Sequence, residues 1–282
     1  MHTVEQLGLL KMDFLGLRNL SIVDRTLELI GSESLDIDNL KLDDEKTFKL
    51  FAEGKMTGVF QLESRVAQST SRSLKPKRFE DIVALVALIR PGPLGAGMHN
   101  EFADRANNRK EIEYLHSDLE SILNETYGVI LYQEQVMQIA EKIAGFNLQE
   151  ADNLRVAMGK KIPKVMEEQR KKFTDGAVSN NYSEQFAIEL FDQIAYFAGY
   201  GFNKSHSVPY ALLAYQTAYL KANYPAEYIA ACLTAVKRDK DRTAIFLSEA
   251  RDMGVKVSTP DVNLSSSDFT VNDNEILFGL SA

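Results

Sequence analysis

Apolar residues recur at intervals of three and four along most of the chain, which is the spacing of one face of an α-helix. In the segment 17–30, for example, Leu20, Val23 and Leu27 share a face, and Gly31 follows as the expected end of the helix. We predict helices at residues 17–30, 43–51, 82–89, 119–123, 134–144, 186–197, 210–221, 225–235 and 243–253. The fold class is therefore predicted to be mainly α.

Apolar and polar residues alternate with a period of two only in short stretches, which predict strands. In a predicted strand at residues 9–15, Lys11 and Asp13 share one face, and apolar side chains share the other. These two residues can hold a phosphate and a metal together, or they can form an exposed charge pair on an edge strand. We also predict an extended run at 127–132 and short strands at 255–257, 269–271 and 276–279, the last two as a hairpin.

The composition is that of an ordinary globular protein, with 45% hydrophobic and 26% charged residues. A length of 282 residues suggests about two domains. The sequence contains no run of about 18 apolar residues, so no membrane-spanning segment is expected, and its start lacks the layout of a secretory signal. The one cysteine, Cys232, lies in an apolar helical run and is expected to be a core residue of a cytoplasmic protein.

A net charge of −8 argues against a protein that grips nucleic acid with its whole surface. A local basic groove stays compatible with this charge, because salt screens charges more than about 10 Å apart. The most cationic stretch is 152–172, whose basic residues are Arg155, Lys160, Lys161, Lys164, Arg170, Lys171 and Lys172. With Gly159 as a predicted C-cap and Pro163 opening the next helix, this stretch can hold a polyphosphate. A solvated charged face is the alternative interpretation.

Two further sets of cations precede this stretch. One is a basic segment without any intervening acid, suited to the phosphate backbone of a nucleic acid, and it contains Arg65, Arg72, Lys75, Lys77 and Arg78. The other is Arg90, which stands at the mouth of a predicted rigid turn, Arg90-Pro91-Gly92-Pro93-Leu94. Arg90 is either a ligand contact or one partner of a structural salt bridge.

The segment 199–207 reads GYGFNKSHS and lies between two predicted helices. Its glycines allow a close approach to a ligand, and its rings, Tyr200 and Phe202, can stack on one. Asn203, Lys204 and His206 can donate hydrogen bonds, although a lone histidine is also a common structural donor. Asp36 and Asp38 lie in a short polar connection, and we do not predict a metal site there.

Several of these segments together resemble a known family. The segments KMDFLGLRNL, GVFQLES, LIRPGPL, YGVILYQEQVM, RVAMGKK and GYGFNKSHS, followed by PYALLAYQTAYLKANYPAEY, occur in the order typical of bacterial DNA polymerase III alpha subunits, the C-family replicative polymerases. The resemblance covers most of the chain. It implies a helical fingers domain at 21–238, preceded by a palm remnant at 1–20 with an N-terminal strand. Residues 239–282 are then the C-terminal, β-containing end of the fingers, leading to a DNA-binding domain.

The resemblance also implies roles for individual residues. Asp13 corresponds to the third metal-binding carboxylate of the palm, and Lys11 to a contact with the incoming triphosphate. Arg155 corresponds to a fingers arginine that grips this triphosphate; the family commonly has a second arginine next to it, where this chain has Val156. Asn203, Lys204 and His206 are implied nucleotide contacts, although the family pattern is lost at Val208-Pro209. Our predicted nucleotide-binding residues also include Arg90, Lys160 and Lys161.

The implied activity is DNA-directed DNA synthesis, in which a primer 3′-hydroxyl attacks a deoxynucleoside triphosphate with two Mg²⁺ ions at the centre. The first two catalytic aspartates of the family lie upstream of its third, so we expect a piece of a longer polymerase that is inactive alone. The implied partners are primer-template DNA, a sliding clamp, a clamp loader and a proofreading exonuclease, in the nucleoid of the cytoplasm and not at a membrane.

Two other functions are compatible with the residues themselves. The two basic stretches suit a non-enzymatic helical module that binds nucleic acid, whose affinity for duplex would depend on salt and not on deoxynucleotides. A stand-alone phosphotransferase would need its own phosphate-binding loop, and neither GxxxxGK[ST] nor GxGxxG occurs in the sequence.

Overall fold

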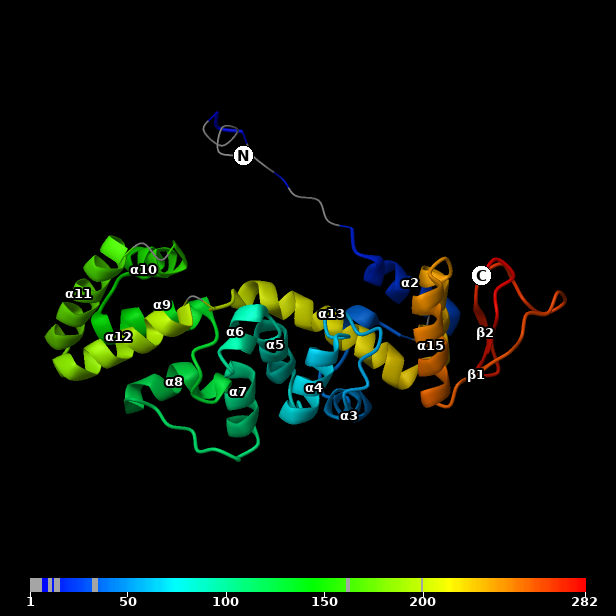
Figure 1. The fold of residues 1–282 in the computed structure, drawn as a ribbon, viewed down its shortest axis with the longest axis horizontal. Coiled ribbons are helices and arrows are strands. Elements are labelled where there is room, and N and C mark those ends of the chain that lie inside the picture. Colours follow the sequence, from blue (N-terminus) through cyan, green and yellow to red (C-terminus); the bar gives the residue numbers. More distant parts are fainter. Residues whose placement is uncertain (1–6, 10–11, 13–15, 32–34, 161–162, 199) are drawn as a thin grey trace. The chain divides into compact units, whose positions relative to one another are not determined.

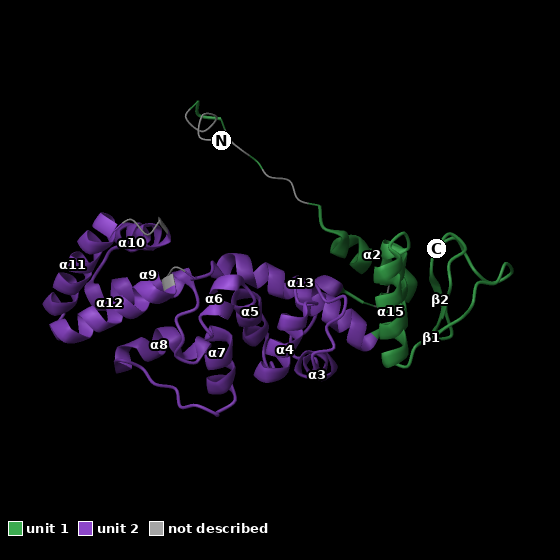
Figure 2. Cartoon of the chain, viewed as in Figure 1, with its two compact units in different colours: residues 1–36, 224–282 green, residues 37–223 purple. Residues whose placement is uncertain are grey.

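The computed structural model describes residues 7–9, 12, 16–31, 35–160, 163–198 and 200–282 (Figure 1). The chain divides into two compact units (Figure 2). Unit 1 combines Met1–Asp36 with Tyr224–Ala282, and unit 2 is Ile37–Asn223. Within the described ranges, no helix is long and apolar enough to cross a membrane.

Helices dominate both units, as the sequence predicts. The α-helices are α2 (Arg18–Ile30), α3 (Glu45–Glu53), α4 (Arg65–Leu74), α5 (Phe79–Leu88), α6 (Pro91–Gly95), α7 (Met98–Ala106), α8 (Glu120–Leu123), α9 (Gln133–Ala144), α10 (Leu148–Lys160), α11 (Pro163–Ser179), α12 (Glu184–Ala198), α13 (Lys204–Asn223), α14 (Pro225–Val236) and α15 (Lys240–Asp252). Short 3₁₀ turns occur at Ile37–Asn39, Ser117–Leu119 and Asn124–Thr126. The strands are β1 (Lys256–Val257), β2 (Thr270–Asn272) and β3 (Glu275–Leu277).

Unit 1 packs α14 against α2, α15 and a small sheet. The strand order is β1-β3-β2, with β1 parallel and β2 antiparallel to β3. The predicted hairpin is therefore confirmed, and its turn places Asp273 and Asn274 at positive φ, as aspartate and asparagine tolerate. Cys232 is fully buried in α14, which confirms it as a core residue.

Unit 2 contains two hydrophobic clusters. The first surrounds α5 and α13, and every residue of α5 from Asp81 to Leu88 is buried. The fully buried Tyr215 on α13 links this cluster to residues 41–44, since its hydroxyl donates to the Lys41 carbonyl at 2.9 Å and accepts from the Asp44 amide at 3.0 Å. The second cluster is built by α9, α10, α11 and α12. The candidate site lies where the segments around Tyr132 and Phe202 meet.

Asp44 is the N-cap of α3, and its carboxylate accepts hydrogen bonds from the Thr47 amide at 2.8 Å, the Thr47 hydroxyl at 2.7 Å and the Asn223 amide group at 3.2 Å. Burial alone raises the pKa of Asp44, but these hydrogen bonds outweigh burial, and the pKa lies below its ordinary value. The stabilisation is therefore complete above the unfolded-state pKa and is lost as the pH falls through the folded-state pKa.

We expect Asp44→Asn to make the stability of the chain less sensitive to acid. Asparagine keeps a capping oxygen and has no titrating proton, so the variant should lose less unfolding free energy than the wild type between about pH 7 and about pH 3. Urea denaturation of both proteins across this range measures the difference. Parallel pH profiles would show that the Asp44 carboxyl contributes nothing to the pH dependence.

Three sequence predictions need correction. Gly159 is not a C-cap: α10 continues through it to Lys160, and Leu154 and Met158 pack this end of the helix into the second cluster. The predicted turn after Arg90 is a short helix, α6, with Pro91 in its first turn, where proline is compatible with a helix.

The third correction concerns α13, which begins at Lys204 instead of the predicted Tyr210 and contains Pro209 within it. Its start is fixed by Asn203, whose side-chain oxygen accepts a hydrogen bond from the His206 amide at 2.8 Å. Capping of this kind stabilises the first helical turn. Pro209 lies beyond that turn, and it cannot donate the backbone hydrogen bond that a residue at its position would otherwise make to the Ser205 carbonyl.

Candidate functional site

Two segments that are distant in the sequence meet in unit 2. Tyr132 and Phe202 form a parallel β-bridge, the Phe202 amide donates to the Leu131 carbonyl at 3.0 Å, and the Gln133 amide donates to the Phe202 carbonyl at 2.9 Å. These bonds fasten the start of α9 to the segment just before α13. These two backbone hydrogen bonds therefore fix the position of Phe202, and with it the predicted ligand-binding residues that follow it.

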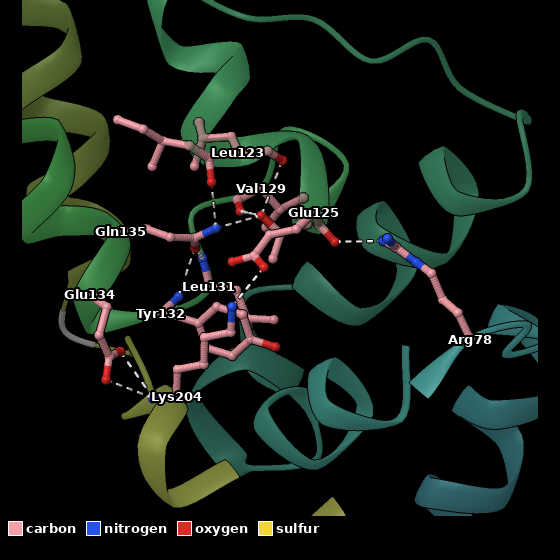
Figure 3. A network of polar contacts seen from close by, with 11 residues as sticks. Arg78, Leu123, Glu125, Val129, Leu131, Tyr132, Glu134, Gln135 and Lys204 are labelled. Carbon is pink, nitrogen blue, oxygen red and sulfur yellow. Dashed lines mark hydrogen bonds and ion pairs between the residues drawn. The ribbon is translucent and has the colours of Figure 1, made fainter. Parts of the chain in front are cut away.

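Lys204 is held by two carboxylates, one at each end of the residue. Its amide donates to both oxygens of Glu134, at 3.1 and 3.0 Å, and its Nζ lies 2.6 Å from Oε2 of Glu125 (Figure 3). Nζ also lies 5.5 Å from the centre of the Tyr132 ring. Burial is the main reason that the pKa of Tyr132 is raised, so its hydroxyl stays neutral beside the cation.

Gln135 supports this arrangement from inside the protein, where only 1% of its surface is exposed. Its Oε1 accepts hydrogen bonds from the amides of Leu131 and Tyr132, each at 2.9 Å. Its Nε2 donates to the Thr126 hydroxyl at 2.8 Å and to the Ile122 carbonyl at 3.3 Å. One buried side chain thus satisfies the backbone of the extended run that carries the bridge to Phe202.

Arg155 reaches the same region from α10. Its guanidinium forms an ion pair with Asp152, with 2.8 Å between Nη2 and Oδ1, and Nη1 donates to Oε1 of Gln133 at 3.4 Å. Gln133 in turn donates from Nε2 to the Gly201 carbonyl at 3.3 Å. Gln133 therefore connects Arg155 to the segment 201–204.

Arg90 reaches this segment from another direction. Its Nη2 donates to the Tyr200 carbonyl at 2.6 Å, its Nε donates to the Ala87 carbonyl at 3.0 Å, and its guanidinium lies 4.3 Å from the centre of the Phe202 ring. Burial lowers the pKa of Arg90, but an arginine stays charged at neutral pH. These partners are carbonyls and a ring, so the positive charge of Arg90 is not neutralised by them.

Asn203 and His206 complete the segment. Both are exposed. Asn203 uses its side-chain oxygen as the cap of α13, and the His206 ring packs against Tyr210, with 4.2 Å between ring centres. His206 also lies 5.6 Å from the Phe202 ring. The side chain of His206 is therefore oriented by two aromatic rings at the helix start.

The contacts above join five of the predicted nucleotide-binding residues to one short segment: Arg90, Arg155, Asn203, Lys204 and His206. Lys11, Asp13 and Lys161 lie outside the described residues, as does the side chain of Lys160 at the end of α10.

The predicted DNA-binding residues divide into two groups. Arg65, Arg72, Lys75 and Lys77 are exposed on and just after α4. Arg78 is instead engaged within the protein: its Nε lies 3.2 Å from Oδ1 of the buried Asp81, its Nη2 donates to the Glu125 carbonyl at 2.7 Å, and its guanidinium lies over the Tyr127 ring. Its observed contacts organise residues 125–127, next to the carboxylate that holds Lys204 (Figure 3).

A groove of about 890 Å³ in unit 2 is not lined by Arg90, Arg155 or Lys204. Its lining includes apolar residues such as Leu119 and Ile130. Its charged residues are four acids and one base: Glu101, Glu113, Glu189, Asp192 and Arg105. Such an acidic lining repels a triphosphate, so we place the candidate site at the segment 201–204 and not in the groove. Among the described residues, no group of three or more His, Cys, Asp or Glu side chains can hold a metal ion.

Sequence reasoning assigned no role to Glu125, Gln133, Glu134 or Gln135. Three of them belong to YGVILYQEQVM, for which the sequence predicts an extended run and the start of a helix but no role for these side chains. Polar residues at the start of a helix are the available sequence signal, but they are common at any helix start. The roles of Glu125, Gln133 and Glu134 depend on partners 68 to 79 residues away, and no local pattern predicts such contacts. Gln135 instead bonds residues 3 to 13 positions away, but its burial depends on the tertiary packing.

The chain is similar to bacterial DNA polymerase III alpha subunits over nearly its whole length. A family model described as the bacterial DNA polymerase III alpha subunit finger domain matches residues 19–181. The DNA polymerase III subunit alpha of Saccharopolyspora erythraea is 50% identical over 285 residues, covering 99% of this chain and 24% of the relative. The corresponding protein of Thermus aquaticus is 50% identical over 291 residues, covering 100% and 24%. That of Escherichia coli K12 is 48% identical over 292 residues, covering 99% and 25%. The chain thus spans about a quarter of the length of these relatives.

Proposed function

Because the chain belongs to the bacterial DNA polymerase III alpha subunit family, we propose that it is the fingers part of a DNA-directed DNA polymerase. The reaction would be transfer of a nucleotide from a deoxynucleoside triphosphate to the 3′-hydroxyl of a primer, with release of pyrophosphate. In this proposal the chain binds the incoming nucleotide and the primer-template, and closes over the new base pair.

The observation that carries the nucleotide-binding role is the placement of three cations around one segment. Arg90, Arg155 and Lys204 come from three different helices or helix starts and all contact residues 200–204 or their immediate partners. A triphosphate carries several negative charges, and guanidinium and ammonium groups are its usual protein partners. The Lys204 ammonium group would exchange Glu125 for a phosphate oxygen when the nucleotide binds. In this proposal the ion pair with Glu125 orients the ammonium group before binding.

Magnesium belongs to the proposed reaction, where it activates the hydroxyl and neutralises the leaving charge. The described residues do not form a site for it, and a lone carboxylate such as Asp13 is a poor magnesium ligand set. We therefore propose that Asp13 contributes one ligand, with Lys11 beside it, and that the remaining carboxylates come from a palm outside this chain.

We extend the proposal to the DNA through the exposed cations on and just after α4, namely Arg65, Arg72, Lys75 and Lys77, which suit contacts with the phosphate backbone. The sliding clamp, the clamp loader and the exonuclease are proposed partners of the whole polymerase, at the replisome in the cytoplasm. The domain division proposed from the sequence places the palm remnant at 1–20, the fingers at 21–238 and the following segment at 239–282.

Primer extension tests the proposed function. The full-length polymerase should extend a primer in the presence of Mg²⁺ and deoxynucleotides, and this 282-residue chain should not, because it lacks the other palm carboxylates. Metal-dependent synthesis by this chain alone would contradict the assignment of the remaining ligands to another domain. No synthesis by the full-length protein would contradict the proposed activity.

The exposed cations of α4 favour one alternative, a helical module that binds nucleic acid without catalysis. Such a module would bind duplex DNA with a strong dependence on salt, and deoxynucleotides would not change its affinity. A polymerase instead forms a complex with primer-template that the correct deoxynucleotide tightens. Fluorescence anisotropy of labelled primer-template, with and without the correct deoxynucleotide, distinguishes the two functions.

A further inference from the structure

Glu134 occupies a position that links two helices. It lies in the first turn of α9, yet its carboxylate accepts hydrogen bonds from the amide of Lys204, the first residue of α13 and 70 residues further along the chain. The two distances, 3.0 and 3.1 Å, are nearly equal, so both carboxylate oxygens share one amide proton. Contacts of this length are ordinary hydrogen bonds to a charged acceptor.

This contact performs the task of a cap. The first amides of a helix have no acceptor within the helix, and the residue before it commonly supplies one. Here the side-chain oxygen of Asn203 accepts a hydrogen bond from the His206 amide, and the acceptor of the Lys204 amide is the carboxylate of Glu134. A carboxylate at this end of a helix also interacts favourably with the helix dipole. Glu134 thereby fixes where α13 begins with respect to α9.

The position of the helix start decides where the Lys204 side chain can reach. Its backbone is held by Glu134 and its Nζ is 2.6 Å from Glu125, which leaves the ammonium group on the side of residues 125–132. Since the first amide of α13 already has a carboxylate acceptor, a phosphate arriving here meets the ammonium group of Lys204 and not this amide. The binding of anions therefore depends on the lysine side chain and on its support.

We propose that Glu134 is a positioning residue for nucleotide binding, which sets the place of Lys204 through its backbone amide and does not itself touch the nucleotide. This inference rests on the function proposed above, in which Lys204 contacts the triphosphate. It assigns to a negatively charged residue a favourable effect on the binding of a negatively charged ligand. If Glu134 acted only by repelling the negative charge of the nucleotide, its removal would tighten nucleotide binding, whereas the proposal predicts weaker binding.

The test uses the full-length polymerase and steady-state kinetics with deoxynucleotide as the varied substrate. Glu134→Ala should raise the KM for deoxynucleotide by roughly three- to tenfold, the size of a lost charged cap, and change kcat by less than about twofold. Glu134→Gln keeps an acceptor oxygen and should recover part of this loss. Should Glu134→Ala fail to fold, as judged by circular dichroism, Glu134→Gln carries the test with a smaller expected increase.

A double-mutant cycle separates positioning from other effects. Lys204→Ala alone should raise the KM by more than Glu134→Ala does, and adding Glu134→Ala to Lys204→Ala should then change the KM by less than about twofold. Glu141→Ala removes a carboxylate from the same helix, seven residues further on, and serves as the matched control with an unchanged KM.

The outcomes distinguish this inference from the proposed function. If Lys204→Ala raises the KM and Glu134→Ala leaves it unchanged or lowers it, the inference is wrong and the role of Lys204 stands. If Glu134→Ala has the same effect with and without Lys204, Glu134 does not act through Lys204, and the inference is again wrong. If Lys204→Ala itself leaves the KM unchanged, the proposed role of Lys204 in nucleotide binding fails, and the inference fails with it.

Discussion

Arg155→Ala in the full-length polymerase is expected to lower kcat/KM for deoxynucleotides by roughly ten- to a hundredfold. A hydrogen bond to a charged group is worth about 1.5–3 kcal/mol, which corresponds to such a factor if Arg155 binds the triphosphate in the transition state. The arginine is available for this role, because 34% of its side chain is exposed and its bond to Gln133 is long, at 3.4 Å. Single-turnover incorporation of one deoxynucleotide measures the change.

Arg170→Ala is the matched control for this experiment. Arg170 lies on α11, is 35% exposed and pairs with Asp192, so it resembles Arg155 in exposure and in having an acidic partner. No contact joins it to the segment 201–204 within the described part of the chain, and its replacement should leave the kinetics unchanged. Equal losses in both variants would indicate a general effect of charge, and unchanged kinetics in Arg155→Ala would contradict the proposed contact.

Gln135→Met should lower the free energy of unfolding of the chain by about 2–5 kcal/mol. Methionine matches glutamine in shape, but it gives the amides of Leu131 and Tyr132 no acceptor of comparable strength, and both residues are buried. Each buried donor without a partner costs about 1–3 kcal/mol, and the Thr126 hydroxyl loses its donor as well. The hydrogen bonds from Gln135 support the extended run that forms the bridge to Phe202. Their loss should therefore also loosen the position of Lys204, which follows Phe202 by two residues.

Gln138→Met provides the comparison, since Gln138 lies on the same helix and is exposed. An exposed glutamine exchanges its hydrogen bonds with water, so this substitution should change stability by less than about 0.5 kcal/mol. Urea denaturation followed by circular dichroism measures both variants. A loss in Gln135→Met no larger than that in Gln138→Met would show that the Gln135 network contributes little to stability.

Many helices were predictable because they depend on local periodicity, but α4 and α7 were not predicted. The apolar spacing predicts the helix that α2 forms but not its buried face: Val23 is buried, whereas Leu20 is 58% exposed and Thr26 is buried instead. The glycines that follow α2, α3 and α9 end these helices at positive φ. The start of α13 was predicted six residues too late, since its cap depends on Asn203 and on Glu134 of another helix. A proline in the sequence indicates a boundary, but only the capping contacts show on which side of it the helix begins.

The candidate site was predictable in part. Arg155 and Lys204 were identified through a family resemblance, and the comparisons confirm the family. What each side chain touches was not predictable, as Arg78 shows. It was grouped with four other cations for DNA contacts, yet it binds Asp81 and the Glu125 carbonyl, whereas Arg65 on α4 is exposed. A linear sequence places these arginines in one basic segment and carries no information on which of them finds a buried acid.

The sequence by itself determined the mainly helical fold, the C-terminal hairpin and the family, because helix periodicity, turn residues and extended motifs are local properties of the chain. Only the tertiary structure decided that Glu125, Gln133 and Glu134 surround Lys204 and connect it to Arg155. These contacts join residues brought together by the packing of α9 against α10 and by the bridge between Tyr132 and Phe202. A hydrogen bond acts over about 3 Å, so its partners are set by the folded backbone and not by distance along the sequence.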